Sequence, residues 1–510
     1  MSRIKRTSSI LIFIILILTL TLTSCGRGTG TNQDKEAVSS QTAGTAFQAK
    51  ALEYAPIYNN YNLTITVEPE NGAVQVVEKL QYVNNTGLEL NSLYFHVYLN
   101  AFSEDSSATP YAPERSRRIF PKGVKYAEVN ISEVYLNGRS QDYDLTDSLL
   151  TISFHEPIAP GASAEIILAF DAYVPEMNHR TGRDENGMWF GNFIPLAAVY
   201  DEFGWHREPY YAIGSPFYSE AATFTATITA PEEYTVISTG IESSKISDNR
   251  NVTTVTTKLS RDFSFVVLKD LQTAELSTAA GVYIRIYYRN GTEINQEEYL
   301  AAAEKTLQFY SDNVGTYPYT RLDLVECSLY AEIFAAYPEI VFMDSEYMGK
   351  SGALSSLAHS IGHQWFYNVV GNNNIKEAWL SESFITCLQA IMAADDESEL
   401  RLSMIDDYTT LKEKLNALEN RTLLTDVSAY ETNEEHYYIQ FIRGKLMMYS
   451  LRNKIGSDKF ASFIKTYYNQ FLFRNSSRAG FIQIAQDIYQ DDLLEFFDDW
   501  MLNYDLPALY

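Results

Sequence analysis

Cysteine is scarce in this chain of 510 residues, which contains only three. One of them, Cys25, follows an apolar run near the start of the chain, so only Cys327 and Cys387 remain for a folded domain. Cys327 lies in a strand-like stretch and Cys387 in a helix-like one, which favours two separate buried thiols, with a disulfide between them as the alternative. Stability must therefore come from a hydrophobic core, for which an apolar content of 46% is sufficient.

Basic residues are also few, because 39 Lys and Arg stand against 65 Asp and Glu and give a formal net charge of −26. Such a chain repels the phosphates of nucleic acid, so we expect no nucleic-acid partner. The acidic balance favours solubility in an extracellular setting. It carries no information about a reaction.

Long hydrophobic runs are limited to ILIFIILILTLTL, residues 10–22, which follows the basic start MSRIKR. The run has the form of a secretory signal and is too short for a comfortable transmembrane helix. It ends in LTSC, Leu22 to Cys25, which resembles the lipobox of bacterial lipoproteins. We therefore predict a lipoprotein signal peptide at 1–24 and lipidation of Cys25, with an ordinary signal or an uncleaved anchor as alternatives.

A Gly/Ser/Thr/Gln-rich stretch follows this site and reads as a flexible tether over residues 25–50. Together these features predict a protein anchored by lipid to a bacterial cell membrane, on its extracytoplasmic face. The membrane would then be one of its partners.

Hydrophobic periodicity divides the rest of the chain into two parts. Short stretches that alternate with period 2 predict an N-terminal antiparallel β-sandwich over residues 51–275, for example YNLTITVEP, AVQVVEKLQYV and TFTATITAP. Apolar spacing of 3 to 4 residues then predicts a mostly helical α+β domain over residues 276–510, with short strands in RLDLVECSLY and YPEIVFM. The fold class we expect is multidomain.

Two histidines, His359 and His363, stand four residues apart in the helix-like stretch LAHSIGHQWF. This spacing places both rings on one helical face, close enough to share a cation, although a chance pair on a half-buried face is the alternative. Eighteen residues further on, Glu382 opens a second helix-like run, WLSESFITC. Two imidazoles and one carboxylate would leave a fourth tetrahedral position open to water.

At these residues the chain resembles a known family. HSIGHQWFYNVV, the eighteen-residue spacer and WLSESF are similar to the zinc-binding signature of the membrane alanyl aminopeptidase and leukotriene hydrolase family of zinc metallopeptidases, of the gluzincin type, in which HExxHQWFGN and WLNEGF recur. The resemblance extends over nearly all of residues 51–510 and includes SLYFHVYLNAF, VGTYPYTRLDLVE, YPEIVFM and FIRGKLMMYSLR.

The resemblance implies a β-sandwich followed by a thermolysin-like catalytic domain. It also implies that His359, His363 and Glu382 bind one zinc ion. Glu377 stands where the family often has an acidic residue; it either supports the ligands or is a solvated charge at a helix start.

Three positions depart from the family pattern. Ser360 stands where the family has the glutamate that acts as general base, and its hydroxyl is too weakly basic for that role. Ala336, beside the substrate-binding position Tyr337, stands where a glutamate anchors the substrate amine, and Phe441 stands where a tyrosine donates a hydrogen bond to the oxyanion. Substitutes for the lost groups are Glu332 or Glu339 for the anchor and Tyr437 or Tyr438 for the donor.

The sequence therefore supports three hypotheses. The first is a zinc-binding peptidase homologue that has lost most or all hydrolysis, a pseudoenzyme that binds a peptide or protein ligand in its cleft. The second is an active zinc metallopeptidase, aminopeptidase-like, with a non-standard base. The third is zinc as a purely structural link between two helices. The missing base favours the first.

Overall fold

The structure is a computed structural model that describes residues 58–108, 110–112, 115–330, 333–415, 418 and 421–509. The predicted signal peptide, tether and lipidation site at Cys25 lie outside these residues. Over the described ranges, none of the helices is both long enough and apolar enough to cross a membrane.

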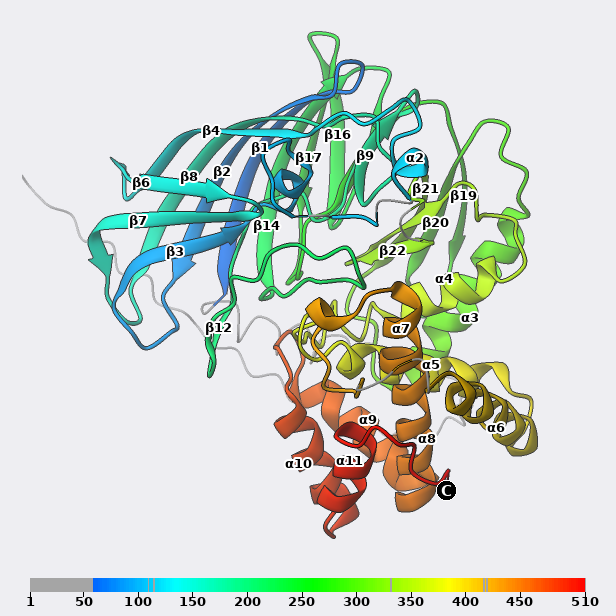
Figure 1. Ribbon diagram of the computed structural model, residues 1–510. Helices are drawn as coiled ribbons and strands as arrows, with labels where there is room; N and C mark the ends of the chain where they lie inside the picture. Colours follow the sequence, from blue (N-terminus) through cyan, green and yellow to red (C-terminus); the bar gives the residue numbers. More distant parts are fainter. Residues whose placement is uncertain are drawn as a thin grey trace, which may run out of the picture. The chain divides into compact units, whose positions relative to one another are not determined.

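An eight-stranded sheet is the largest element of the first half of the chain (Figure 1). Its strands follow the order β16, β17, β14, β1, β2, β8, β4, β5. In chain order they are β1 (Asn59–Glu68), β2 (Ala73–Val83), β4 (Glu128–Leu136), β5 (Arg139–Ser140), β8 (Ser163–Tyr173), β14 (Ala222–Pro231), β16 (Ile241–Ser247) and β17 (Arg250–Thr256).

Smaller sheets accompany the large one. One has the order β11 (Leu196–Ala197), β3 (Leu90–His96), β7 (Leu149–Ile158), β6 (Asp142–Thr146), and another the order β15 (Thr235–Ser238), β18 (Phe265–Leu268), β10 (Gly187–Phe190), β9 (Thr181–Asp184). A two-stranded hairpin is formed by β12 (Tyr200–Asp201) and β13 (Gly204–Trp205).

A single hydrophobic core lies between the large sheet and the smaller ones. Alternate residues of β1, among them Leu63 and Ile65, are fully buried and share one cluster with Phe95 of β3 and Ile152 of β7. Period-2 burial of this kind is what the sequence predicted, and it makes the first half a β-sandwich. The N-terminal β-sandwich of the expected multidomain fold is therefore confirmed.

One pairing in the sandwich differs from the antiparallel expectation. β1 and β14 pair in parallel, with Asn59 opposite Ala222 and Thr66 opposite Thr229. The two strands lie far apart in sequence, so a long crossover rather than a hairpin joins them. Burial alternates with period 2 in both kinds of pair, so the sequence pattern could not distinguish them.

The second half is built on a five-stranded sheet with the order β19, β20, β21, β23, β22. These strands are β19 (Leu271–Ser277), β20 (Tyr283–Arg289), β21 (Arg321–Cys327), β22 (Phe334–Tyr337) and β23 (Ile340–Asp344). β20 pairs with β21 and β21 with β23 in parallel, while β22 is an antiparallel edge strand. The boundary predicted between residues 275 and 276 falls inside β19.

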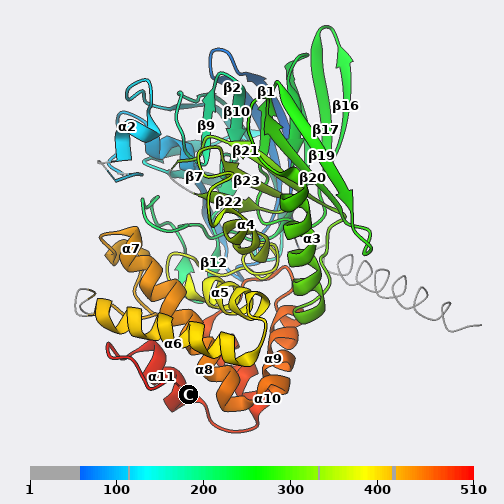
Figure 2. The ribbon, with the colours of Figure 1, turned by 90° about the vertical axis from the view of Figure 1, so that its right-hand side faces the viewer.

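Helices α3 and α4 lie against this sheet, and the remaining helices follow them (Figure 2). From α3 on they are α3 (Gln296–Asn313), α4 (Ala353–Gly362), α5 (Trp379–Ala393), α6 (Glu397–Lys414), α7 (Asn433–His436), α8 (Gly444–Ile455), α9 (Ser457–Gln470), α10 (Arg478–Tyr489) and α11 (Leu494–Met501), whereas the short α2 (Ser116–Ile119) belongs to the first half of the chain. Between α7 and α8 the chain continues as a π-helical segment, η6 (Tyr437–Arg443), and two 3-10 segments are η2 (Tyr98–Phe102) and η5 (Val427–Ala429).

Buried contacts connect the sandwich to the second half. A second cluster joins Trp189 of β10 and Val266 of β18 to Val325 and Phe342 of the five-stranded sheet. Arg261, which is 1% exposed, also spans the two halves: it donates hydrogen bonds to the Ser219 carbonyl and to Oδ1 of Asn475. The two halves thus share interior surface.

Both cysteines of the folded part are free and buried. Cys327 belongs to the second cluster, and Cys387 lies on the buried face of α5. The expectation of two separate buried thiols is confirmed, and the alternative disulfide is wrong.

Candidate metal centre

Helix α4 presents both histidines to one side. His359 lies in its last turn, and His363 follows the final residue with helical dihedral angles and an N–H that bonds to the His359 carbonyl at 3.3 Å. Four residues of helix amount to about one turn, so the two rings come to lie side by side. Their centroids are 5.0 Å apart.

Glu382 meets these rings from the first turn of α5. Its Oε2 lies 3.3 Å from Nε2 of His359, and its Oε1 lies 3.7 Å from Nε2 of His363. One ligand atom from each of the three residues lies within 4.8 Å of the others. The three side chains that the sequence singled out for a metal are therefore brought together.

The electrostatics of the triad suit a cation. Burial lowers the pKa of His363 to about 4, so its imidazole is neutral near pH 7. Nδ1 of His363 faces the Phe366 carbonyl at 3.2 Å, which leaves the Nε2 lone pair for a metal. Burial alone would raise the pKa of Glu382, but the neighbouring His363 and His359 outweigh burial and lower it.

One atom of the triad is poorly compensated. Oε2 of Glu382 is buried, and apart from Nε2 of His359, at 3.3 Å, it has no polar partner among the described residues. An uncompensated buried carboxylate oxygen costs free energy, and a bound cation would compensate it. The donor set of two nitrogens and one oxygen fits a metal ion.

A residue without a side chain allows α4 and α5 to approach. A Cβ at Gly362 would lie 2.6 Å from Oη of Tyr310 and 2.8 Å from Cγ2 of Ile385, closer than real contacts allow. Phe366 and Phe384 stack across the same junction with centroids 4.5 Å apart. The helices are thus locked at a separation that carries Glu382 to the histidines.

The triad opens into a cleft of about 600 Å³. Each of the three departures from the family pattern, Ser360, Ala336 and Phe441, lines this cleft, as does Tyr337. The ring of Phe441 stacks on that of His359, with centroids 5.6 Å apart and planes at 17°. A hydroxyl-free ring therefore covers one side of the triad.

The structure distinguishes the residues that the sequence offered as replacements for the oxyanion donor and the amine anchor. Tyr437 lines the cleft and is 47% exposed, whereas Tyr438 is not among the lining residues and has Lys414 over its ring. Tyr437 is thus the one of the two that reaches the cleft. Glu332 lies outside the described residues.

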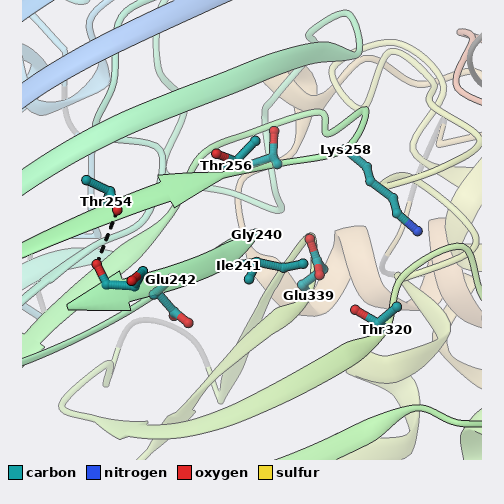
Figure 3. A pocket seen from close by; sticks show the side chains of 10 residues that line it. Gly240, Ile241, Glu242, Thr254, Thr256, Lys258, Thr320 and Glu339 are labelled. Atoms are coloured by element: carbon teal, nitrogen blue, oxygen red, sulfur yellow. Dashed lines mark hydrogen bonds between the residues drawn. The ribbon is translucent and has the colours of Figure 1, made fainter.

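Glu339 does not replace the amine anchor. Its buried carboxyl lines another cavity, of about 350 Å³, together with Lys258 and Thr320 (Figure 3). The reason is the tight β22–β23 turn, in which Glu339 adopts a φ of +64° and its N–H bonds to Oε1 of Gln364. That turn directs the side chain away from the cleft.

Glu377 is occupied elsewhere. Its carboxylate accepts the backbone N–H of Arg478, the first residue of α10, at 3.3 Å. Burial raises its pKa. Glu377 therefore joins α10 to the segment before α5 and contacts no member of the triad.

Sequence reasoning missed a polar wall that the sandwich contributes to the cleft. This wall, formed by Arg180, Asn192 and Asp262, lines the same cleft as the triad. Asn192 donates from Nδ2 to Oδ2 of Asp262 at 2.7 Å, and Arg180 donates to Oγ of Ser215 at 2.7 Å. The signal available in the sequence was weak, because these residues stand more than ninety positions before the histidines.

Comparisons with known proteins agree with this geometry. Residues 299–500 match the model of the peptidase family M1 domain. The similarity to peptidase family M1 domains therefore holds for this part of the chain. The family resemblance drawn from the sequence is therefore confirmed.

Relatives of the M1 domain include aminopeptidases. Aminopeptidase 2 of Candida albicans is 23% identical over 420 residues, which cover 75% of this chain and 43% of that protein. Aminopeptidase M1-B of Oryza sativa subsp. japonica is 23% identical over 254 residues, covering 46% of this chain and 29% of that protein. The chain spans less than half the length of these relatives.

Solved structures share the fold. An M1 zinc metallopeptidase from Deinococcus radiodurans superposes with a TM-score of 0.62 at 18% identity, covering 89% of this chain and 95% of that one. A mutant of that enzyme bound to a Tyr-Ser-Ala substrate superposes with a TM-score of 0.63. The overall fold of this chain is thus shared with these solved structures.

A buried histidine braces the segment that leads into α5. His206 lies between Asp201, at 2.7 Å, and Glu208, at 3.3 Å, and Nδ2 of Asn373 lies 3.1 Å from its Nδ1. Burial alone would lower the pKa of His206, but hydrogen bonds to Glu208 and Asp201 outweigh burial, so its pKa is raised. Protonation lets the ring donate to both carboxylates, whereas Nδ2 of Asn373 can donate to Nδ1 only when the ring is neutral.

This brace predicts a pH-dependent contribution to stability. A raised folded-state pKa gives stability that is complete below the unfolded pKa of about 6.5 and is lost as pH rises through the folded value. His206→Gln should therefore cost on the order of 1 kcal/mol more at about pH 5.5 than at about pH 8.5. Denaturant unfolding of both proteins at the two pH values measures this; an equal cost at both would contradict it.

Proposed function

We propose that this chain is a zinc-binding peptidase homologue that binds a peptide or a protein segment in its cleft and hydrolyses it weakly or not at all. One observation carries the proposal: the metal triad is assembled, while the groups around it lack the chemistry of hydrolysis. Ser360 lines the cleft beside His359, and Phe441 stacks on that histidine.

Zinc is the metal that the donor set favours. Imidazole nitrogens and a carboxylate are ligands of a tetrahedral zinc site, whereas calcium and magnesium prefer oxygen. His359, His363 and Glu382 would hold the ion. When bound, it would supply Lewis-acid polarisation and a lowered pKa for water.

The residues that surround the metal triad would contribute little to hydrolysis. Near neutral pH the hydroxyl of Ser360 does not take a proton from water, since its basicity is far too low. Phe441 offers no donor to a developing oxyanion, and Ala336 offers no anion to a substrate amine. A general base is worth roughly 10² to 10⁴ in rate and an oxyanion donor roughly 10² to 10³, so their loss removes most of the catalysis.

Binding of a peptide does not require a general base, an oxyanion donor or the amine-anchoring glutamate. The edge strand β22 carries Ala336 and Tyr337 along one wall of the cleft. An edge strand can pair with an extended peptide through main-chain hydrogen bonds, with side chains held in neighbouring pockets. A cleft of about 600 Å³ has the size of a site for a small ligand or a few residues of peptide.

The first prediction for this function concerns the metal. The protein should bind one zinc ion, and saturating zinc at about 100 times Kd should raise its free energy of unfolding by about 2.7 kcal/mol. His363→Ala should abolish both effects. His96→Ala, which removes another buried histidine with a pKa lowered to about 4, should leave both intact. Metal analysis and thermal denaturation with and without zinc provide the measurement; an unchanged zinc content in His363→Ala would refute the site.

The second prediction concerns catalysis. The zinc-loaded protein should hydrolyse amino-acid amides and short peptides at a rate reduced by roughly 10⁴ or more from that of an intact enzyme. Ser360→Glu alone should restore little, because catalytic groups that act together are strongly non-additive. The triple variant Ser360→Glu, Ala336→Glu, Phe441→Tyr tests whether hydrolytic activity can be restored. Robust, chelator-sensitive cleavage by the unmodified protein, lost in His359→Ala, would show that another group serves as base.

The third prediction concerns location. We infer lipid anchoring at the extracytoplasmic face of a bacterial membrane from the LTSC site and the tether that follows it. Cys25→Ala should either be shed in soluble form or persist as an uncleaved precursor, as fractionation and mass spectrometry would show. A processed, membrane-bound protein with an unmodified Cys25 would contradict the inference.

A further inference from the structure

Asp262 stands out among the residues that line the cleft. Apart from the metal-triad residue Glu382, it is the one carboxylate that the described lining contains. It comes from the segment just before β18 of the sandwich rather than from the helices that carry the triad. It is 5% exposed, so its limited exposure is toward the cleft that it lines.

Hydrogen bonds hold the carboxylate in a defined position. Oδ2 accepts from Nδ2 of Asn192 and Oδ1 accepts from the N–H of Phe263, each at 2.7 Å. Asn192 in turn accepts at Oδ1 from the hydroxyl of Tyr337, at 3.2 Å. The chain of contacts therefore runs from the edge strand β22 to Asp262 across the cleft wall.

Acceptor capacity remains after these contacts. An ionised carboxylate has about four lone-pair sites, and the two donors occupy two of them. A buried carboxylate pays a desolvation cost, which Arg180 on the same wall offsets in part and a charge-assisted hydrogen bond from a cationic ligand would offset further. Ala336, on the same lining, contributes only a methyl group.

We propose that Asp262 is the cation-recognition group of the cleft and binds a primary ammonium group of a peptide ligand. This inference rests on the proposed function, in which the cleft binds peptides. The ammonium is either the free α-amine of the peptide or the side chain of a lysine, two sources with the same chemistry. In both cases the N–H groups donate to the carboxylate oxygens of Asp262.

Neighbouring groups keep the carboxyl of Asp262 able to ionise, and the two cations of the lining are held by other partners. Burial raises the pKa of Asp262 to about 7, while Phe263, Asn192 and Arg180 act in the opposite direction and favour its ionised form. An arriving ammonium would favour ionisation further. Arg180 is held on the same wall by Ser215 and by the ring of Phe217, 5.0 Å from its guanidinium carbon. Lys445, also in the lining, pairs with Asp407.

The test compares three uncharged or singly charged probes by equilibrium binding to the full chain. They are trialanine amide, which has a free α-amine, its N-acetylated form, and N-acetyl-Ala-Lys-Ala amide. The wild-type protein should bind at least one cationic probe about tenfold more tightly than the N-acetylated trialanine amide, a difference of about 1.4 kcal/mol. The probe that shows the preference identifies the source of the ammonium.

Variants assign the preference to Asp262. Asp262→Asn keeps the shape and should bring all three affinities within about twofold of one another. The matched control is Glu339→Gln, because Glu339 also has a pKa raised to about 7 by burial but lines the other cavity. That control should keep the tenfold preference.

Each outcome has a defined meaning. Equal binding of all three probes to the wild type, or an undiminished preference in Asp262→Asn, overturns the inference and leaves the proposed function standing. Failure of all three probes to bind removes the proposed function and the inference with it. If Asp262→Asn does not fold, Asn192→Ala removes the donor that orients the carboxylate; it should reduce the preference at least threefold, and an unchanged preference there overturns the inference.

Discussion

The metal centre depends on a close approach between α4 and α5 that is possible because residue 362 has no side chain. A Cβ at Gly362 would collide with side-chain atoms of Tyr310 and Ile385, so part of this junction would have to shift. The same junction holds Glu382 at 3.3 and 3.7 Å from the two histidines. Overpacking a well-filled interior of this kind typically costs about 1–3 kcal/mol. The position of one glycine thus couples the packing of the helices to the geometry of the triad.

In this protein the residues that position the metal triad are different from those at the positions of the hydrolytic groups. The ligands are positioned by helix periodicity, by the helix junction and by the stack of Phe366 on Phe384. The groups that a hydrolase would add, a base, an amine anchor and an oxyanion donor, occupy other positions and can be lost without disturbing that packing. Phe441 even gains a ring contact with His359 where a hydroxyl would otherwise be expected. Under the proposed function, a metal-binding cleft would persist where hydrolysis has weakened.

Local sequence patterns predicted the parts of the site that local structure determines. The spacing of His359 and His363 follows from helix geometry, and the alternating strands of the sandwich follow from period-2 burial. The family resemblance added Glu382 and the three replaced groups. Each of these is fixed by a short motif.

The features that the sequence could not predict depend on contacts between residues far apart in the chain or on the geometry of a turn. Asp262 and Asn192 enter the cleft from the sandwich, and no periodicity links them to helices a hundred residues later. The parallel pairing of β1 with β14 has the same burial pattern as an antiparallel one. Glu339 matched the expected chemistry, yet the tight β22–β23 turn directs it into a different cavity. The function of Asp262, Asn192 and Glu339 could be judged only once the fold showed which cavity each side chain lines.

The most direct test of the account is a crystal structure of the zinc-loaded wild-type protein soaked with an unmodified tripeptide bearing a free amine. We expect the metal on His359, His363 and Glu382, and an intact peptide along β22 with its ammonium group at Asp262. An intact peptide would show a cleft that binds without cleaving. Electron density for cleaved products alone at the metal, with no intact peptide, or a peptide bound elsewhere with the cleft empty, would contradict the account.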